Sequence, residues 1–187
     1  MSYTYLLPFG RGQAFLGSVG NFANKVVSGW QISGISTFQT GQPFSITYTA
    51  PGSPVGLVSG RANLVPGVAL YPAKKTLTQW FNPAAFTAPP TYTSNGIEYA
   101  TYGDSGYNML RGPAWQDWDM NLEKNIVFGD RYKVQLRADS FNIFNHPNFG
   151  TPNAAISNPS TVGTVTSIAS SPNYEARTVE FAAKFSF

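Results

Sequence analysis

The stretch "ARTVEFAAKFSF", residues 176–187, decides the fold because its apolar and polar side chains alternate almost without a break. In an extended chain, successive side chains point to opposite faces. One face of this segment carries Val179, Phe181, Ala183, Phe185 and Phe187. The other face carries Thr178, Glu180, Ala182, Lys184 and Ser186. The pattern predicts a β-strand that separates an apolar medium from a polar one.

Two longer segments upstream repeat this alternation and are predicted to form a hairpin. Residues 117–128 place apolar side chains at Trp118, Met120, Leu122, Ile126 and Phe128. Residues 131–144 do the same with Tyr132, Val134, Leu136 and Ala138. Gly129 and Asp130 between them suit a tight turn, because glycine accepts a positive φ. Two further strands are predicted at 2–7 and 30–40, and the second of these could continue through 43–49.

The alternation is broken at two places. Lys124 falls on the apolar face of its strand, so it requires either a bulge or a stem that carries the ammonium group toward a polar region. After Asp139 the apolar phase shifts to Phe141 and Ile143. Such a shift indicates a β-bulge or a strand that leaves its apolar surroundings. Between the first two strands, residues 21–27 could form one or two helical turns.

The composition supports β structure with long loops and excludes several classes of function. Among 187 residues, 11% are charged, compared with about 25% in an average globular protein. Aromatic residues reach 15%, with 18 glycines and 14 prolines. The net charge of +3 is scattered, which argues against a nucleic-acid partner. No cysteine is present, so disulfides and thiolate metal sites are excluded.

The strand lengths bear on which apolar medium the sheet contacts. Segments 117–128, 131–144 and 176–187 match the roughly 9–11 residues that cross a bilayer with tilt. No apolar run reaches the roughly 18 residues of a membrane helix, and the first residues do not form a signal peptide. Alternation with a dyad period is typical of an outer-membrane barrel wall, although a β-sandwich shows the same period.

Aromatic residues and charges give the barrel interpretation more detail. If the short turn at 129–130 is periplasmic, then Trp30, Phe128, Tyr132 and Phe187 lie at that membrane interface. The opposite rim would carry Trp115, Trp118, Phe144 and Tyr174. The interface aromatics are therefore predicted to be Trp30, Trp118, Phe128 and Tyr132. The lumen-facing polar residues are predicted to be Lys133, Arg137, Asp139, Glu180 and Lys184, with opposite charges pairing between strands. The long loops 50–116 and 145–175 would share the outer side.

Few residues are candidates for catalysis or for metal binding. His146, the single histidine, lies next to Pro147 in a predicted loop. Asp117 and Asp119 share a strand face and could act as paired carboxylates, but polar lining of a lumen explains them as well. No catalytic, metal-binding or cofactor-binding residues are predicted, and we expect no enzymatic activity. Aromatic side chains in the loops could stack on sugars or peptides, or pack against one another: Trp80, Phe81, Phe86, Tyr92, Tyr99, Tyr102 and Tyr107.

Several stretches together resemble the C-terminal barrel of TonB-dependent receptors, in particular the Oar-like branch with a carboxypeptidase-regulatory-like domain. They are "SYTYLLPFGRG", "GWQISGISTFQTGQPFSI", "WFNPAAFTAP", "YGDSGYNMLRGPAWQDWDMNLEKNI", "QLRADSFNIFNHPNFGTP" and "RTVEFAAKFSF". The resemblance covers essentially the whole chain, and "RADSFNIFNHPNF" and "WFNPAAF" carry most of it. Glu123 departs from it, standing where the family leads us to expect an apolar residue.

The resemblance implies a barrel of roughly 22 strands that is preceded by a plug, a TonB-contacting segment and a signal peptide. We expect none of these three upstream parts within residues 1–187. Residues 1–187 would then be a C-terminal fragment of the barrel. The implied partners are outer-membrane lipid, the rest of the barrel and plug, TonB, and the barrel-assembly machinery. In this family the last strand is the assembly signal, which implies that role for Val179, Phe181, Phe185 and Phe187.

The predicted fold class is therefore all-β, an antiparallel meander of about five long strands that forms part of a transmembrane barrel. The predicted location is the outer membrane of a Gram-negative cell, and the predicted function is TonB-dependent transport. Five strands are not competent alone, because lipid leaves the edges of an open sheet unsatisfied. The alternatives are a structural or adhesive outer-membrane barrel and a secreted carbohydrate-binding β-sandwich.

Overall fold

The chain folds into two compact units, a sheet unit and a loop unit. The structure is a computed structural model that describes residues 1–49, 59–129, 131–169 and 176–187. The sheet unit contains residues 1–38, 116–147 and 176–187. The loop unit contains the described parts of 39–115 and 148–170.

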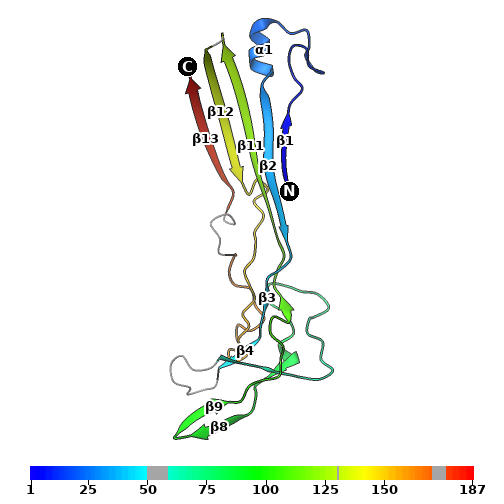
Figure 1. The fold of residues 1–187 in the computed structure, drawn as a ribbon. Coiled ribbons are helices and arrows are strands. Elements are labelled where there is room, and N and C mark those ends of the chain that lie inside the picture. The colour runs from blue at the N-terminus through cyan, green and yellow to red at the C-terminus, as the bar shows by residue number, and fades with distance from the viewer. Residues whose placement is uncertain (50–58, 130, 170–175) are drawn as a thin grey trace. The chain divides into compact units, whose positions relative to one another are not determined.

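The sheet unit is built on five strands (Figure 1). They are β1 (Ser2–Leu6), β2 (Trp30–Gln39), β11 (Trp115–Phe128), β12 (Tyr132–Phe141) and β13 (Thr178–Ser186), in that order across the sheet. Each lies within three residues of a predicted strand. β1 pairs with β2, β11 with β12 and β12 with β13, each time antiparallel. The all-β prediction is confirmed.

The register places the alternating residues of three strands on common faces. β11 and β12 pair from Met120 opposite Ser140 to Phe128 opposite Tyr132, and β12 and β13 pair from Lys133 opposite Ser186 to Phe141 opposite Thr178. Both ladders are unbroken, so the phase change after Asp139 is not a bulge. The strand instead ends at Phe141, and Asn142 turns the backbone with a φ of 48°.

The connections between strands differ in length at the two ends of the sheet. Gly129 has a φ of 61°, as the predicted turn requires, while Asp130 and the rim residue Tyr174 lie outside the described residues. The connection between β1 and β2 reaches the same end as this turn and contains α1 (Asn21–Val27), which confirms the predicted helical turns. Among the described residues, no helix has the length and hydropathy that a membrane-crossing helix needs.

The loop unit has an apolar core, which the sequence pattern did not predict. Its short strands are β3 (Pro43–Phe44), β4 (Thr47–Thr49), β5 (Ser59–Arg61), β6 (Asn63–Leu64), β7 (Phe86–Thr87), β8 (Thr91–Ser94), β9 (Ile97–Ala100) and β10 (Leu110–Arg111), with the 3₁₀ turn η1 (Pro83–Ala85). They pair as β3–β10, β4–β5, β6–β7 and β8–β9. Segment 43–49 thus belongs here and does not continue β2, which ends at Gln39.

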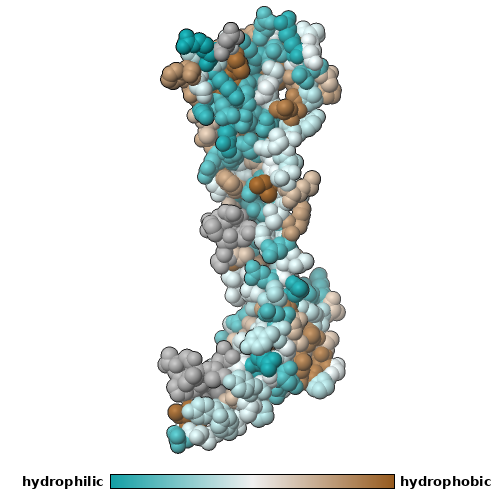
Figure 2. Space-filling model, viewed as in Figure 1, coloured by the Kyte–Doolittle hydropathy of each residue, from teal (hydrophilic) through white to brown (hydrophobic). Residues whose placement is uncertain are grey.

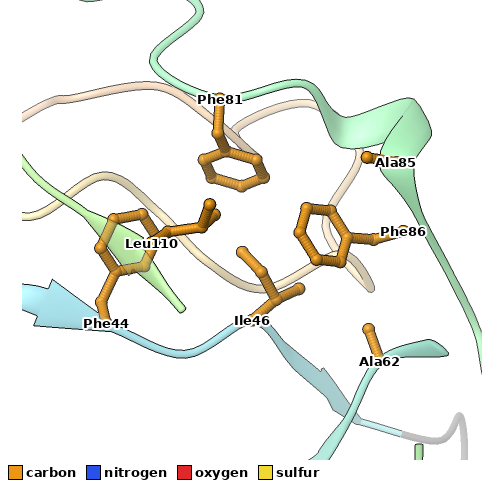
Figure 3. Packing of buried hydrophobic residues seen from close by; sticks show 7 residues of the cluster. All are labelled: Phe44, Ile46, Ala62, Phe81, Ala85, Phe86 and Leu110. Atoms are coloured by element: carbon orange, nitrogen blue, oxygen red, sulfur yellow. The ribbon is translucent and has the colours of Figure 1, made fainter. Parts of the chain in front are cut away.

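The core of the loop unit gathers side chains that are far apart in the sequence. It consists of Phe44, Ile46, Ala62, Phe81, Ala85, Phe86 and Leu110, which Figure 3 shows pointing toward one another. The ring of Phe81 lies 5.9 Å from that of Phe44 and 5.8 Å from that of Phe86, centroid to centroid. Tilted and edge-to-face geometries of this kind are favourable for aromatic pairs.

Gly34 of β2 provides a test of the packing in the sheet. A Cβ atom there would lie 2.5 Å from the carbonyl oxygen of Asp119 and 2.6 Å from the hydroxyl of Tyr3. Gly34→Ala is therefore expected to cost about 1–3 kcal/mol of unfolding free energy, because neighbouring strands must shift. The measurement is urea unfolding of the barrel that contains the chain. Gly106→Ala is the control, since its Cβ would make only an ordinary contact at 3.8 Å, and equal losses would contradict the prediction.

Candidate functional site: the two faces of the sheet

One face of the sheet is apolar and exposed over β13. Phe181 is 82% exposed, and Phe185 and Phe187 are also exposed. Phe181 lies opposite Ala138 and Phe185 opposite Val134, so the apolar side chains of the two strands share this face. Exposed apolar residues in such an array mark a surface that water does not normally cover. In the described residues, no second sheet covers them, which removes the geometry that a β-sandwich requires.

The other face is polar and carries a hydrogen-bonded network across three strands. Asp139 accepts from Asn121 at 2.6 Å and forms an ion pair with Arg137 at 3.0 Å. Asn121 in turn accepts from the hydroxyl of Ser33 at 3.3 Å. This network joins β2, β11 and β12, and it holds the Asp139 carboxylate with several donors. In the view of Figure 2, hydrophilic residues gather over the sheet along β11 and β12.

A second group on the same face centres on Glu123. Its Oε1 accepts from Asn125 at 2.5 Å and from Gln135 at 2.7 Å, and Arg137 is its partner in the register. Glu123 therefore belongs to the polar face. The resemblance led us to expect an apolar residue at this position, but the register shows that strand β11 keeps its alternation there.

A hollow of about 290 Å³ lies on the sheet beside this network. Four strands contribute to its lining, which includes the polar-face side chains Ser2, Thr4, Ser33, Asp119, Asn121 and Asp139. Asp119 is engaged there, because its Oδ1 accepts from the backbone amide of Asn142 at 3.0 Å. The hollow is open, and its lining mixes polar and apolar side chains, so the structure assigns it no ligand.

The structure places all five predicted lumen residues on the polar face. In the register, Lys133 lies opposite Ser186, Arg137 opposite Ala182, Gln135 opposite Lys184, and Asp139 opposite Glu180. Arg137 forms its ion pair with Asp139, two residues along its own strand, and faces the opposite charge of Glu123 across the β11–β12 ladder. Asp139 instead faces a like charge across the ladder. That this face lines a lumen stays a prediction.

The amide and hydroxyl members of the network were not singled out from the sequence. Ser33, Asn121, Asn125 and Gln135 carry no charge, so only their position in the polar phase could have indicated them. Their donors satisfy Asp139 and Glu123 in the interior of the sheet. Neutral side chains therefore contribute as much to the hydrogen-bonded network of the polar face as charged ones do.

Lys124 lies on the apolar face without a bulge. Its neighbours Glu123 and Asn125 both keep their partners in the β11–β12 ladder. The side chain is only 4% exposed, its Nζ donates to the carbonyl oxygen of Ser28, and the ring of Trp30 lies 5.4 Å from it. The aliphatic part of the Lys124 side chain thus carries its ammonium group toward the end of the strand, where a cation–π contact with Trp30 partly replaces the hydration of that group.

The four predicted interface aromatics lie at the two ends of the sheet. Trp30, Phe128 and Tyr132 lie at the end with the short turn, and Tyr132 stacks on Phe185 at 5.9 Å. Trp118 lies toward the other end, where its ring contacts Phe38 at 5.4 Å and Phe144 at 5.7 Å. Their positions agree with two aromatic belts, and their contact with a membrane interface stays a prediction.

No centre for metal or acid–base chemistry emerges in the part of the chain that the structure describes. No group of three His, Asp or Glu side chains there could hold a metal ion. The backbone of His146 is held by Asn142, whose side chain bonds both its amide and its carbonyl, as expected of an ordered loop. Asp117 accepts from the amide of Trp118 within the polar face.

The loop aromatics divide between packing and exposure. Phe81 and Phe86 are buried in the core, and Tyr92 and Tyr99 stack on each other at 5.5 Å across the β8–β9 hairpin. The indole nitrogen of Trp80 donates to the carbonyl of Arg111. Tyr102 and Tyr107 are exposed. Mutual packing therefore accounts for most of this set.

The Asp139 network gives a testable prediction. Asp139→Ala removes the acceptor of Asn121 and Arg137. The part-buried amide of Asn121 loses its partner, which is expected to cost about 1 kcal/mol of unfolding free energy, while the half-exposed Arg137 keeps water as a partner. Lys184→Ala on the same face is the matched control, because Lys184 makes no hydrogen bond or ion pair that the structure describes, and it should cost nearly nothing. Urea unfolding of the barrel in vesicles measures both, and an unaffected Asp139 variant would contradict the network's role.

Comparison with known proteins agrees with the two-faced sheet. Neither a curated protein nor a solved structure matches the chain. A family model described as an outer membrane beta barrel domain matches residues 1–180. A sheet with one exposed apolar face and one polar face is what an outer-membrane barrel wall requires, and β2, β11, β12 and β13 are long enough to cross a bilayer. The chain belongs to the outer membrane β-barrel domain family, and its place is the outer membrane.

Proposed function

We propose that the chain forms part of the barrel wall of a TonB-dependent receptor that brings a solute or a polypeptide across the outer membrane. The observation that carries the proposal is the open sheet. Among the described residues, β1 pairs only with β2, and β13 pairs only with β12. Each backbone group left unpaired in hydrocarbon costs several kcal/mol. More strands are therefore needed to close the wall.

The charges on the polar face favour a wide barrel, and with it a transporter, over a small one. The smallest outer-membrane barrels close with about eight strands and fill their interior with side chains. Here the polar face carries charges that the sheet itself does not satisfy, since Lys133, Glu180 and Lys184 make no ion pair in the described residues. A wide barrel with a polar plug in its lumen would supply partners for such charges.

The loop unit supports a receptor in particular. The connection between β2 and β11 folds around its own apolar core. Long connections with an ordered core are typical of functional surfaces, because a connection that only joins two strands needs no more than a few residues. We assign this unit to the outer surface, where it would recognise the transported molecule.

The test begins with the natural gene product in isolated outer membranes. An antibody against the β8–β9 hairpin is expected to detect a heat-modifiable protein several times larger than the 20.3 kDa of this chain. In living cells the same protein is expected to crosslink to TonB. A large barrel without a TonB crosslink would instead support the structural or adhesive alternative. A product of the chain's own mass in the membrane would contradict both the fragment and the transport proposals.

The roles assigned to the last strand remain proposals. Val179, Phe181, Phe185 and Phe187 lie on the exposed apolar face of β13 or directly follow it, where the barrel-assembly machinery could read them. No enzymatic activity or cofactor is proposed, and the partners are outer-membrane lipid, the remaining barrel and plug, TonB and that machinery.

A further inference from the structure

The connection between β1 and β2 exposes more apolar surface than a water-facing loop should. It spans residues 7–29 and includes α1. Four of its large apolar side chains are more than half exposed: Phe15, Leu16, Phe22 and Val26. Phe22, at 83%, and Val26, at 56%, are four residues apart and so lie on one side of the helix. This face has no partner among the described residues.

Two contacts hold the last turn of α1 against the apolar side of the sheet. The indole nitrogen of Trp30 donates to the carbonyl of Val26 at 3.0 Å. The ammonium group of Lys25 lies 5.0 Å from the centroid of the Phe128 ring. Phe128 shares its face with Tyr132 and, through the alternation of β11, with Leu122 and Ile126. The helix therefore joins the apolar wall at the end of the sheet that carries the short turn.

We propose that α1 and its flanking loop form a second membrane contact, an interfacial segment that inserts Phe22 and Val26 into the boundary between phospholipid headgroups and acyl chains. This inference rests on the proposed barrel wall and adds a surface that the wall alone does not have. The occupant is lipid because the face continues the lipid-facing wall through Trp30 and Phe128. Lys25 supplies a cation at the level of the phosphates, as interfacial helices do.

The connection is also anchored well enough to hold such a helix in place. Arg11 donates from its backbone to the side chain of Asn24 at 2.7 Å and from its guanidinium to Asn21. The backbone amide of Asn24 donates to the carbonyl of Gly20, and the hydroxyl of Ser28 donates to the carbonyl of Asn24 at the end of the helix. These bonds fix both ends of α1, so its exposed face keeps one direction. A short helix of this kind needs external contacts to persist.

Residues 1–187 contain no cysteine, so a single introduced cysteine can be labelled here once any cysteine elsewhere in the full-length barrel is replaced by serine. Single cysteines replace Phe22, Phe181 and Thr93 in the full-length barrel, and each carries a nitroxide label in vesicles of phosphatidylethanolamine and phosphatidylglycerol. At each position, the collision rate of the nitroxide with molecular oxygen, which concentrates in lipid, is divided by its collision rate with a water-soluble nickel chelate. Phe181→Cys is the wall control, and Thr93→Cys, on the exposed β8 strand, is the water control.

The oxygen-to-nickel collision ratio at position 22 is expected to exceed that at position 93 several-fold and to lie below that at position 181. A ratio at position 22 equal to that at 93 would overturn the inference, and so would a label shielded from both reagents, because that result indicates a protein partner. A water-exposed label at 181 would overturn the proposed wall itself. Val26→Cys repeats the measurement on the same helix face in case the Phe22 variant fails to fold.

Discussion

Arginine at position 183 is expected to cost the barrel about 2–4 kcal/mol of stability, whereas arginine at position 182 should cost far less. The two alanines are neighbours in β13 and differ only in the face they occupy. Ala183 pairs with Leu136 on the apolar face, and Ala182 pairs with Arg137 on the polar face. A guanidinium group facing hydrocarbon loses its water, while one facing the polar side keeps it and meets only a like charge.

Urea unfolding of the full-length barrel in vesicles measures both variants, with heat-modifiable gel mobility as the check on folding. Since the starting residue and the substitution are the same, intrinsic strand propensity cancels between them. Equal losses would mean that the two faces do not differ in their contact with lipid, and a larger loss at 182 would reverse the assignment of the two faces. Either outcome would remove the basis for the wall.

The second large effect is expected in the loop unit, where Phe81→Ala should cost about 3–5 kcal/mol. Phe81 is fully buried, and its ring contacts those of Phe44 and Phe86. Its loss leaves a cavity at the centre of the small core that holds several two-stranded pairs together. The unit should then become open to protease added to intact cells, while the sheet unit keeps its gel mobility.

Tyr102→Ala is the matched control for this prediction, because Tyr102 belongs to the same unit and its side chain is 83% exposed. Protease sensitivity of that variant should equal that of the unmodified protein. A Phe81 variant that resists protease as well as the control would show that the core in Figure 3 does not hold the unit together.

The sheet could be predicted from the sequence because its signal is local. A period of two residues sets the faces of β11, β12 and β13, and the register then carries Phe181, Leu136 and Ile126 to one side. Lys124 was recognised as an exception, but the carbonyl of Ser28 that receives its ammonium group comes from a distant part of the chain. Such a partner becomes visible only when the strands are in place.

The loop unit and the polar network could not be predicted, for different reasons. In the loop unit, Ile46, Phe81 and Leu110 come from strands and turns too short to show any period, so their meeting depends on long-range contacts. In the network, alternation gave the correct face for Arg137 and Asp139. It did not give the hydrogen bond from Asn121 to Asp139, which depends on the register that sets Asp139 between Asn121 and Glu180.

The pairing of β3 with β10 has a consequence for the order in which the sheet forms. β2 and β11 are hydrogen-bonded neighbours, yet closing the chain between them costs roughly 4 kcal/mol of entropy for a loop of about 75 residues. The pairing of β3 with β10 closes that loop a few residues beyond both strands, with Pro43 opposite Arg111 and Phe44 opposite Leu110. If the loop unit collapses first, β2 and β11 meet as the arms of a short hairpin, and the slowest contact of the sheet becomes a local one.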